Sequence, residues 1–324
     1  MAMLDFPELP KSSGSVCLEE TDKTLPEKID PNMRYVFFST IAKGGKSLIK
    51  SCKDLHLSRF ICYKTLKPEF AHDVVEQQRL IREARISAML QHPNTIPTYE
   101  LGRDRRGHVF FTMKLVHGYT LRELLNYRQR YDLTQLVELV LQVANALQYA
   151  HKCGVAHRDI KPDNILAGPF GEVLLLDWGL AKVWHSTDAT TAEYESLPAP
   201  IEDITLTGQG AAQGTAHYMS PEQIQKDPGI DCRTDIYSLG AVLYEILCGK
   251  SCARGEKLHE VIESVQSDSP AEPRDVSAQS VPRLLNDLVM RCLAKNPAQR
   301  IQTMDEVVML LQQDWRSDLS YYKD

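Results

Sequence analysis

The residues best suited to chemistry lie in one short segment, His157–Asn164, which has the sequence HRDIKPDN. The segment holds a carboxylate at Asp159, a cation at Lys161 and an amide at Asn164, and a second carboxylate, Asp177, follows thirteen residues later. Carboxylate and amide oxygens are hard ligands of the kind that Mg²⁺ prefers, and a lysine can neutralise phosphate charge. A loop of solvated surface charges is the simplest alternative, but it does not account for the joint spacing.

The segment resembles the catalytic loop H-R-D-x-K-x-x-N of the eukaryotic-type (Hanks-type) protein kinase family, in particular its bacterial serine/threonine branch. Asp177-Trp178-Gly179 is similar to the family's D-F-G metal loop, and the resemblance extends from about Arg34 to Leu311. It implies an α+β, bilobal protein-kinase fold with a small β-rich N-lobe, one main N-lobe helix and a larger α-helical C-lobe. It also implies a serine/threonine kinase that transfers the γ-phosphoryl group of Mg-ATP to protein hydroxyls.

The resemblance assigns roles to the polar residues of these loops. Asp159 is expected to accept a hydrogen bond from the incoming hydroxyl and take its proton, while Lys161 faces the γ-phosphate. Asn164 and Asp177 are the expected ligands of Mg²⁺, for which Mn²⁺ is an alternative.

The same loops contain residues that the resemblance makes structural, namely His157, Arg158, Trp178 and Gly179. Trp178 stands where the family has Phe, whose ring packs against the helix that carries a conserved glutamate. A larger indole can fill that position if its N–H finds a partner. We therefore expect this departure to affect regulation more than chemistry.

Ile61-Cys62-Tyr63-Lys64 resembles the family's V-A-I-K strand. The resemblance implies that Lys64 binds the α- and β-phosphates of ATP and that Glu83, on a helix nineteen residues later, is its catalytic partner. A single lysine on a strand is usually only a solvated charge. The assignment therefore depends on Glu83 and on the downstream loop.

The phosphate loop departs from the family's G-x-G-x-x-G pattern. The matching ATP-binding stretch is Ala42, Lys43, Gly44, Gly45, Lys46 and Ser47. Glycines let backbone amides approach phosphates, and the small replacements keep much of that clearance. Lys46 is expected to add a cation near the phosphates. Looser nucleotide binding and a plain turn both remain open.

By resemblance, the hinge includes Met113 as the gatekeeper side chain. The Lys114 carbonyl and the Val116 amide are expected to bond the adenine of ATP. These are backbone contacts, so the sequence hardly tests them.

The segment Gly214–Glu222 looks like the family's G-T-x-x-Y-M-[A/S]-P-E motif. Thr215 is expected to bond Asp159 and Lys161 and to favour Ser/Thr substrates. Glu222 is expected to form a buried, structural ion pair with Arg300. Asp235 is expected to brace the backbone amides of the catalytic loop.

Arg158 beside Asp159 indicates control by phosphorylation, because in such kinases the arginine pairs with a phosphate on the activation segment. The candidate phosphosites are Thr205 and Thr207, with Thr187, Thr190 and Thr191 as weaker candidates. Each has an equal alternative as an ordinary solvated threonine. A homodimer is expected for autophosphorylation in trans.

The elements that must position these residues change type along the chain. Composition rich in β-branched and aromatic residues predicts strands at residues 34–41, 58–66, 95–101 and 108–115. Helical spacing predicts helices at residues 74–90, 132–153, 235–248 and 303–315. Strands with one helix are thus followed by a helical body, which is an α+β layout.

Local signals refine the helices. Val75, Leu80, Ile81, Ala84 and Ala88 fit one apolar face of the first helix. Asp132 with Gln135, and Thr303 with Glu306, resemble capping boxes, and Gly154 and Gly249 stand where helices end.

The expected domains are an irregular N-terminal extension (1–33), a kinase domain (34–312) and a C-terminal tail (313–324). Within the kinase domain we expect an N-lobe (34–112), a hinge (113–117) and a C-lobe (118–312).

Composition narrows the function. The chain has 324 residues and a net charge of −6, which provides no basic footprint for nucleic acid or an anionic membrane. ATP and proteins bearing Ser or Thr are the expected partners. No apolar run is long enough to span a bilayer, and the N-terminus is not a secretory signal. The chain stops just after its last helix, as a stand-alone kinase or as part of a longer product.

The eight cysteines are scattered, without zinc-type spacing. They are typical of a cytoplasmic protein in a reducing compartment, with a disulfide frame or a metal site as the alternative.

Two other functions compete with an active protein kinase. A pseudokinase, acting as a nucleotide-binding or scaffold module, is favoured only by the altered phosphate loop and Trp178. A small-molecule phosphotransferase of similar fold is disfavoured by the segment Gly214–Glu222, which shapes a peptide site.

Overall fold

The computed structural model describes residue 24 and residues 33–184 and 214–317. These residues form two compact units. We call them the sheet unit (33–91 and 95–118) and the helical unit (92–94, 119–184 and 214–317). The predicted phosphosites Thr205 and Thr207, the three weaker candidate threonines and nearly all of the extension 1–33 lie outside the described residues.

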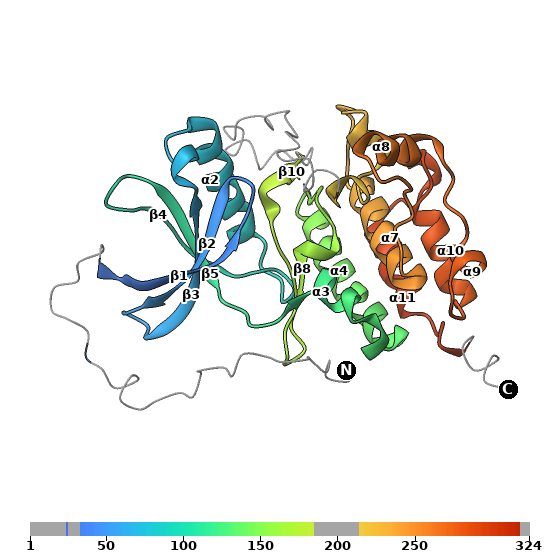
Figure 1. Ribbon diagram of the computed structural model, residues 1–324, viewed down its shortest axis with the longest axis horizontal. Helices are drawn as coiled ribbons and strands as arrows, with labels where there is room; N and C mark the ends of the chain where they lie inside the picture. Colours follow the sequence, from blue (N-terminus) through green and yellow to red (C-terminus); the bar gives the residue numbers. More distant parts are fainter. Residues whose placement is uncertain (1–23, 25–32, 185–213, 318–324) are drawn as a thin grey trace. The chain divides into compact units, whose positions relative to one another are not determined.

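The sheet unit is a five-stranded antiparallel sheet with the strand order β1-β2-β3-β5-β4 (Figure 1). Its strands are β1 (Tyr35–Lys43), β2 (Ser47–Asp54), β3 (Arg59–Leu66), β4 (Thr98–Arg103) and β5 (Val109–Lys114). A short 3₁₀ turn, η2 (Pro68–Phe70), precedes the helix α2 (Val74–Met89). Four of the strands were predicted. The strand β2 is not, because its sequence SLIKSCKD mixes polar and apolar residues, and its pairing with β1 and β3 decides its conformation.

The alternation of side chains along β3 points Lys64 toward helix α2. Tyr63 stacks on Phe110 of β5, with ring centroids 4.4 Å apart, on one face of the sheet. Successive side chains of a strand point to opposite faces. Lys64 therefore lies on the other face, which α2 covers through contacts with β3, β4 and β5.

Helix α2 buries a different set of residues from the predicted apolar face. Asp73 caps it by accepting hydrogen bonds from Val75 N and Glu76 N. Leu80 and Ala84 are buried as predicted, but Val75 is 40% exposed. Glu76 and Glu83 are buried instead. Both carboxylates bind lysines of the sheet unit, so the apolar pattern alone could not identify this face.

The helical unit contains eight α-helices within its described residues and two small antiparallel sheets, β6-β8-β9 and β7-β10. Its helices are α3 (Leu121–Asn126), α4 (Leu133–Lys152), α6 (Pro221–Ile224), α7 (Arg233–Cys248), α8 (Leu258–Ser267), α9 (Pro273–Val276), α10 (Arg283–Cys292) and α11 (Met304–Gln312). Its strands are β6 (Tyr119–Thr120), β7 (Val155–Ala156), β8 (Ile165–Ala167), β9 (Val173–Leu175) and β10 (Lys182–Val183). Its 3₁₀ turns are η3 (Arg128–Arg130), η4 (Pro162–Asn164), η5 (Trp178–Leu180) and η7 (Pro297–Gln299).

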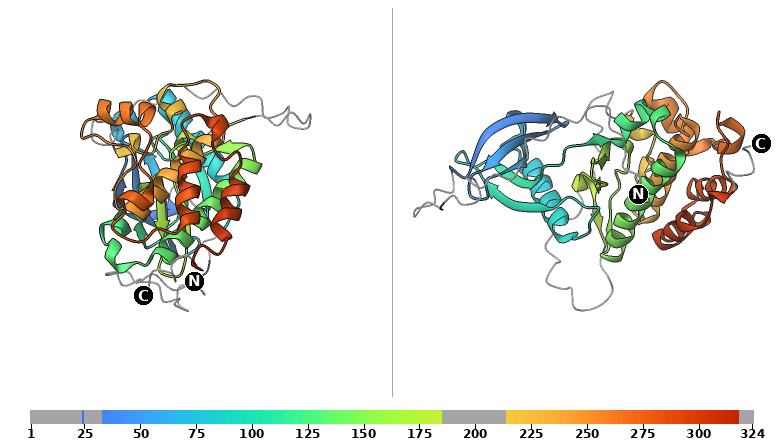
Figure 2. Two further views of the ribbon diagram at one scale, coloured as in Figure 1. Left: turned by 90° about the vertical axis from the view of Figure 1, so that its right-hand side faces the viewer. Right: turned by 90° about the horizontal axis from the view of Figure 1, so that it is seen from below.

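Helix α7 is the centre of this unit, as its nearly all-apolar sequence predicts. It packs against α4 and α10, and α11 lies beside α4 (Figure 2). The approach of α10 needs a glycine, because a Cβ on Gly240 would lie 2.5 Å from the Cβ of Cys292. No side chain larger than hydrogen fits there without moving α10.

The predicted N-caps of α4 and α11 and the glycines after α4 and α7 are confirmed, but α11 ends at Gln312 and not at about residue 315. Asp132 and Gln135 form a reciprocal capping box at α4, and Gly154 follows that helix with a φ of 72°. Thr303 accepts a hydrogen bond from Glu306 N, which is one of the two hydrogen bonds of a capping box at the start of α11. The domain bounds stay predictions, and Trp315, inside the expected tail, is fully buried.

The helices in residues 33–184 and 214–317 include none with the length and apolarity that a membrane crossing requires.

Candidate active site

The catalytic loop lies between β7 and β8 and gathers three of the predicted side chains. Lys161 Nζ donates to both carboxylate oxygens of Asp159, at 3.0 and 2.9 Å. Asn164 Nδ2 donates to Asp159 Oδ2 and to the Asp159 carbonyl, both at 2.8 Å. The turn η4 brings Asn164 back toward Asp159, so the contacts follow from local backbone geometry.

The Asp159 carboxyl sits in an environment that resists ionisation. Burial raises its pKa above the ordinary value, Lys161 opposes this effect, and the charge of Asp177 adds to it. The residue before Asp177 is hydrogen-bonded to the catalytic loop, because Leu176 N donates to the Asn164 carbonyl at 2.8 Å. The arrangement can therefore supply a proton acceptor, Asp159, and a carboxylate that can bind a cation, Asp177.

The donor set fits a hard divalent cation. Asn164 uses its amide N–H groups on Asp159, which leaves its carbonyl oxygen as a ligand. Asp177 has a left-handed backbone, with a φ of 63°, and accepts a hydrogen bond from Gly179 N at 3.3 Å. No cluster of three or more His, Cys, Asp or Glu residues suited to a metal occurs in the described ranges. Two protein oxygens completed by phosphate and water oxygens are typical of Mg²⁺.

Asp235 of α7 binds the backbone of the catalytic loop, as predicted. Its carboxylate accepts hydrogen bonds from His157 N at 2.8 Å and Arg158 N at 2.7 Å. His151 Nε2 lies 2.8 Å from the same carboxylate. Burial by itself raises the pKa of Asp235, but the hydrogen bond and charge of His151, together with His157 and the Arg158 amide, outweigh it and the pKa is lowered. The carboxylate is therefore a fully buried anion that fixes two backbone amides.

His157 connects this loop to the metal loop. Its Nδ1 accepts from Asp159 N at 3.2 Å, and its Nε2 lies 2.9 Å from the Leu176 carbonyl. These partners require the tautomer with the proton on Nε2. The ring also packs on Trp178, with centroids 4.5 Å apart.

Trp178 is buried, at 1% exposure, but its N–H is not satisfied. Nε1 has no hydrogen-bond partner among the residues that the structure describes. We expected the indole to fit this position if its N–H found a hydrogen-bond partner, and no such partner occurs within those residues. A buried unpaired N–H costs about 1–3 kcal/mol.

The segment after the undescribed residues 185–213 reaches the catalytic loop. Lys161 Nζ donates to Thr215 Oγ1 at 3.0 Å. Within the described residues Thr215 bonds Lys161 but not Asp159, so half of the predicted contact is present. Gln223, which no sequence motif marks for this role, donates to the Arg158 carbonyl at 2.7 Å.

The predicted structural ion pair is also present. Arg300 binds Glu222 with two parallel hydrogen bonds of 2.8 and 3.1 Å. Arg300 Nη1 also donates to the Arg233 carbonyl at 2.6 Å, and the arginine side chain is fully buried. This pair ties the Gly214–Glu222 segment to the start of α7 and to the residues before α11.

In the sheet unit, Lys64 and Glu83 form the predicted ion pair. Nζ and Oε1 are 2.5 Å apart, and both side chains are at least 90% buried. The contact joins β3 to α2. The role of the pair in binding ATP stays a prediction.

The phosphate loop, residues 44–46 between β1 and β2, is a tight turn in which Gly44 N donates to Ser47 O at 2.9 Å. Lys46 binds Glu76 of α2, with Nζ and Oε1 2.6 Å apart, and its place near the phosphates stays a prediction. Glu76 could not be predicted from the sequence, because it belongs to no family motif.

The hinge residues lie at the end of the same sheet. Met113 is buried within β5, and Lys114 N donates to the Pro97 carbonyl at 3.0 Å. The Val116 N–H makes no hydrogen bond within the described ranges, which leaves it available to a ligand.

Residues 35–315 match the family described as Protein kinase domain. The chain therefore belongs to the protein kinase family, and its fold is the bilobal α+β kinase fold.

Several curated relatives are bacterial serine/threonine-protein kinases. A probable serine/threonine-protein kinase of Clostridium acetobutylicum is 33% identical over 276 residues, covering 85% of this chain and 39% of that protein. Serine/threonine-protein kinase PknB of Mycobacterium leprae is 31% identical over 277 residues, covering 85% of this chain and 42% of that protein. PknD of Chlamydia trachomatis is 29% identical, covering 86% and 31%. The chain thus spans about two fifths or less of the length of these relatives.

Proposed function

We propose that the chain is an ATP-dependent serine/threonine protein kinase that transfers the γ-phosphoryl group to Ser or Thr hydroxyls of proteins. The observation that carries the proposal is the contact of Lys161 with both Asp159 and Thr215. It joins the proton acceptor, a cation for the γ-phosphate and the segment that shapes the peptide site. The names of the bacterial relatives support the same substrate class.

Each unit contributes a separate part of the chemistry. In the helical unit, Asp159 orients the attacking hydroxyl and accepts its proton, and Lys161 stabilises charge on the transferred group. Asn164 and Asp177 hold the magnesium, which supplies charge neutralisation on the phosphate oxygens. In the sheet unit, Lys64, kept in place by Glu83, binds the α- and β-phosphates, while Lys114 O and Val116 N bond the adenine.

The test is a phosphate-transfer assay with radiolabelled Mg-ATP and a generic protein substrate. Wild type is compared with Asp159→Asn and Lys64→Met, and the labelled residues are identified by phosphoamino-acid analysis. We expect phosphoserine and phosphothreonine from wild type and a loss of about 10³-fold in Asp159→Asn. Equal incorporation by wild type and Asp159→Asn contradicts the proposal.

The proposal extends to regulation. Arg158 pairs with a phosphate on the activation segment, and Thr205 and Thr207 are the proposed acceptors, phosphorylated in trans within a homodimer. Phosphopeptide mapping after incubation with Mg-ATP tests this part. Absence of phosphate between residues 185 and 213 after long incubation contradicts it.

We also propose that the protein works in signalling in the cytoplasm. The seven cysteines in the described part of the chain are all unbridged, which suits a reducing compartment. Cell fractionation with detection of the native chain tests this location.

A pseudokinase is the competing function, and the altered phosphate loop is the observation that favours it. A pseudokinase binds Mg-ATP without transferring phosphate. The same assay, run beside a nucleotide-binding measurement, distinguishes the two.

A further inference from the structure

The phosphate loop is held to α2 by a cluster of three charged side chains, Lys46, Glu76 and Arg79. Lys46 Nζ and Glu76 Oε1 are 2.6 Å apart, and Arg79 Nη1 lies 2.7 Å from the same oxygen. The Glu76 side chain is only 9% exposed, while the two cations are 22% and 25% exposed. A nearly buried carboxylate that binds two cations is a stronger contact than an exposed surface pair.

Further contacts hold the backbone of the same loop. Lys67 N donates to the Lys46 carbonyl at 2.9 Å, and Lys67 Nζ donates to the Gly45 carbonyl at 2.6 Å. Lys46 Nζ also lies 5.8 Å from the centre of the Phe70 ring, within the range of a cation–π contact. The loop is therefore connected to the residues that lead into α2 as well as to α2 itself.

Helix α2 presents two carboxylates to two lysines of the sheet unit, one in a strand and one in the phosphate loop. Glu76 and Glu83 are seven residues apart, which is two turns, and so they lie on nearly the same face about 10.5 Å apart along the axis. Glu83 binds Lys64 of β3, and Glu76 binds Lys46 just before β2. One helix face thus sets the position of a strand lysine and of the phosphate loop together.

We propose that Glu76 is a positioning residue for the phosphate loop, which it holds through Lys46 in the conformation that binds the phosphates of ATP. The proposal rests on the proposed kinase function. Glu76 acts through Lys46 and needs no contact with the nucleotide.

The physical reason is the conformational entropy of the loop. Ordering a free loop when a ligand binds costs conformational entropy, and this cost weakens binding. A loop that is already held by ion pairs loses less entropy on binding. Glu76 therefore stabilises the nucleotide complex by preorganisation, with a larger effect on affinity than on the chemical step.

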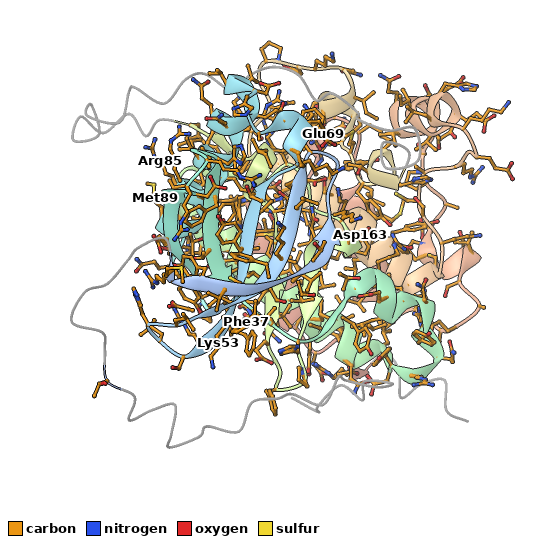
Figure 3. The ribbon with its side chains drawn as sticks, turned by 60° about the vertical axis from the view of Figure 1, so that its left-hand side comes forward. Phe37, Lys53, Glu69, Arg85, Met89 and Asp163 are labelled. Atoms are coloured by element: carbon orange, nitrogen blue, oxygen red, sulfur yellow. The ribbon has the colours of Figure 1, made fainter. Side chains whose placement is uncertain are left out.

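The test measures the dissociation constant of Mg-ATP by calorimetry, together with KM and kcat, for wild type, Glu76→Gln, Lys46→Met and the double variant. Glu69→Gln is the matched control, because Glu69 (labelled in Figure 3) is exposed and lies just before α2. We expect a rise of roughly tenfold in the dissociation constant and in KM for Glu76→Gln, with kcat changed less than about twofold.

The double variant should be no weaker than either single variant, because both changes remove the same tether. Glu69→Gln should behave as wild type, and thermal unfolding checks that every variant is folded. If Lys46→Met weakens binding while Glu76→Gln strengthens it, Lys46 serves the phosphates directly and the proposal is wrong. Unchanged affinity in Glu76→Gln also overturns it. Failure of wild type to bind Mg-ATP at all instead contradicts the proposed kinase function.

Discussion

The two units hold their functional lysines in different ways. In the helical unit, Lys161 contacts a carboxylate two residues away, and Asp235 fixes the backbone amides of the two residues that precede that carboxylate. In the sheet unit, Lys64 and Lys46 contact carboxylates nineteen and thirty residues away, on a separate helix. A local contact survives small movements of neighbouring elements, whereas a contact between two elements is lost when one of them moves. The comparison indicates a rigid catalytic loop and an adjustable sheet unit.

The largest expected effect comes from the helical unit, in Asp159→Asn. Activity should fall by about 10³-fold, because the general base is lost while the shape is kept. Stability should not fall. Burial raises the pKa of Asp159 in the folded state above its value in the unfolded chain. Ionisation of this carboxyl at neutral pH therefore destabilises the folded state. The asparagine amide is neutral at every pH, so this destabilisation is absent from the variant. Kinase assays and thermal unfolding measure both quantities, and a folded variant with full activity would refute the assignment.

Next comes Arg300→Met, which leaves Glu222 as a buried charge without its partner. The free energy of unfolding should fall by about 3–5 kcal/mol, as measured by urea denaturation. Adding Glu222→Gln should restore part of the loss, because the unpaired charge is then absent. If the double variant is no more stable than Arg300→Met, the ion pair does not hold the Gly214–Glu222 segment.

In the sheet unit, Glu83→Gln should lower kcat/KM by roughly tenfold to a hundredfold, because Lys64 loses the charge that positions it. The exposed Glu263→Gln is the control and should keep wild-type kinetics. Since the contact joins two elements, we expect α2 to exchange amide hydrogens faster in Glu83→Gln. An α2 that exchanges as in wild type would show that the sheet unit is as rigid as the catalytic loop.

The smallest effect concerns acid stability through Asp235. Its folded pKa is lowered below an unfolded value of about 3.9, so its stabilisation is complete above that value and is lost as the pH falls through the folded value. Wild type should lose stability from about pH 4 downward, and Asp235→Asn should be less stable at pH 7 but lack this part of the acid transition. Parallel curves for the two proteins would contradict a buried anion at this position.

The sequence by itself determined the class of protein, because the chemistry requires particular side chains at fixed spacing along one short segment. Asp159, Lys161 and Asn164 contact one another through a turn of a few residues, so their arrangement follows from the motif. The helix α4, with Asp132 as its cap and Gly154 after its end, is equally local and was predicted closely.

Only the tertiary structure decided the features that depend on neighbouring elements. Strand β2 has a mixed sequence and forms because β1 and β3 pair with it. The buried face of α2 carries Glu76 and Glu83 instead of Val75, because lysines of the sheet unit neutralise the two carboxylates. Spacing along the chain contains no information about such long-range ion pairs, since each partner alone has the pattern of an ordinary solvated charge.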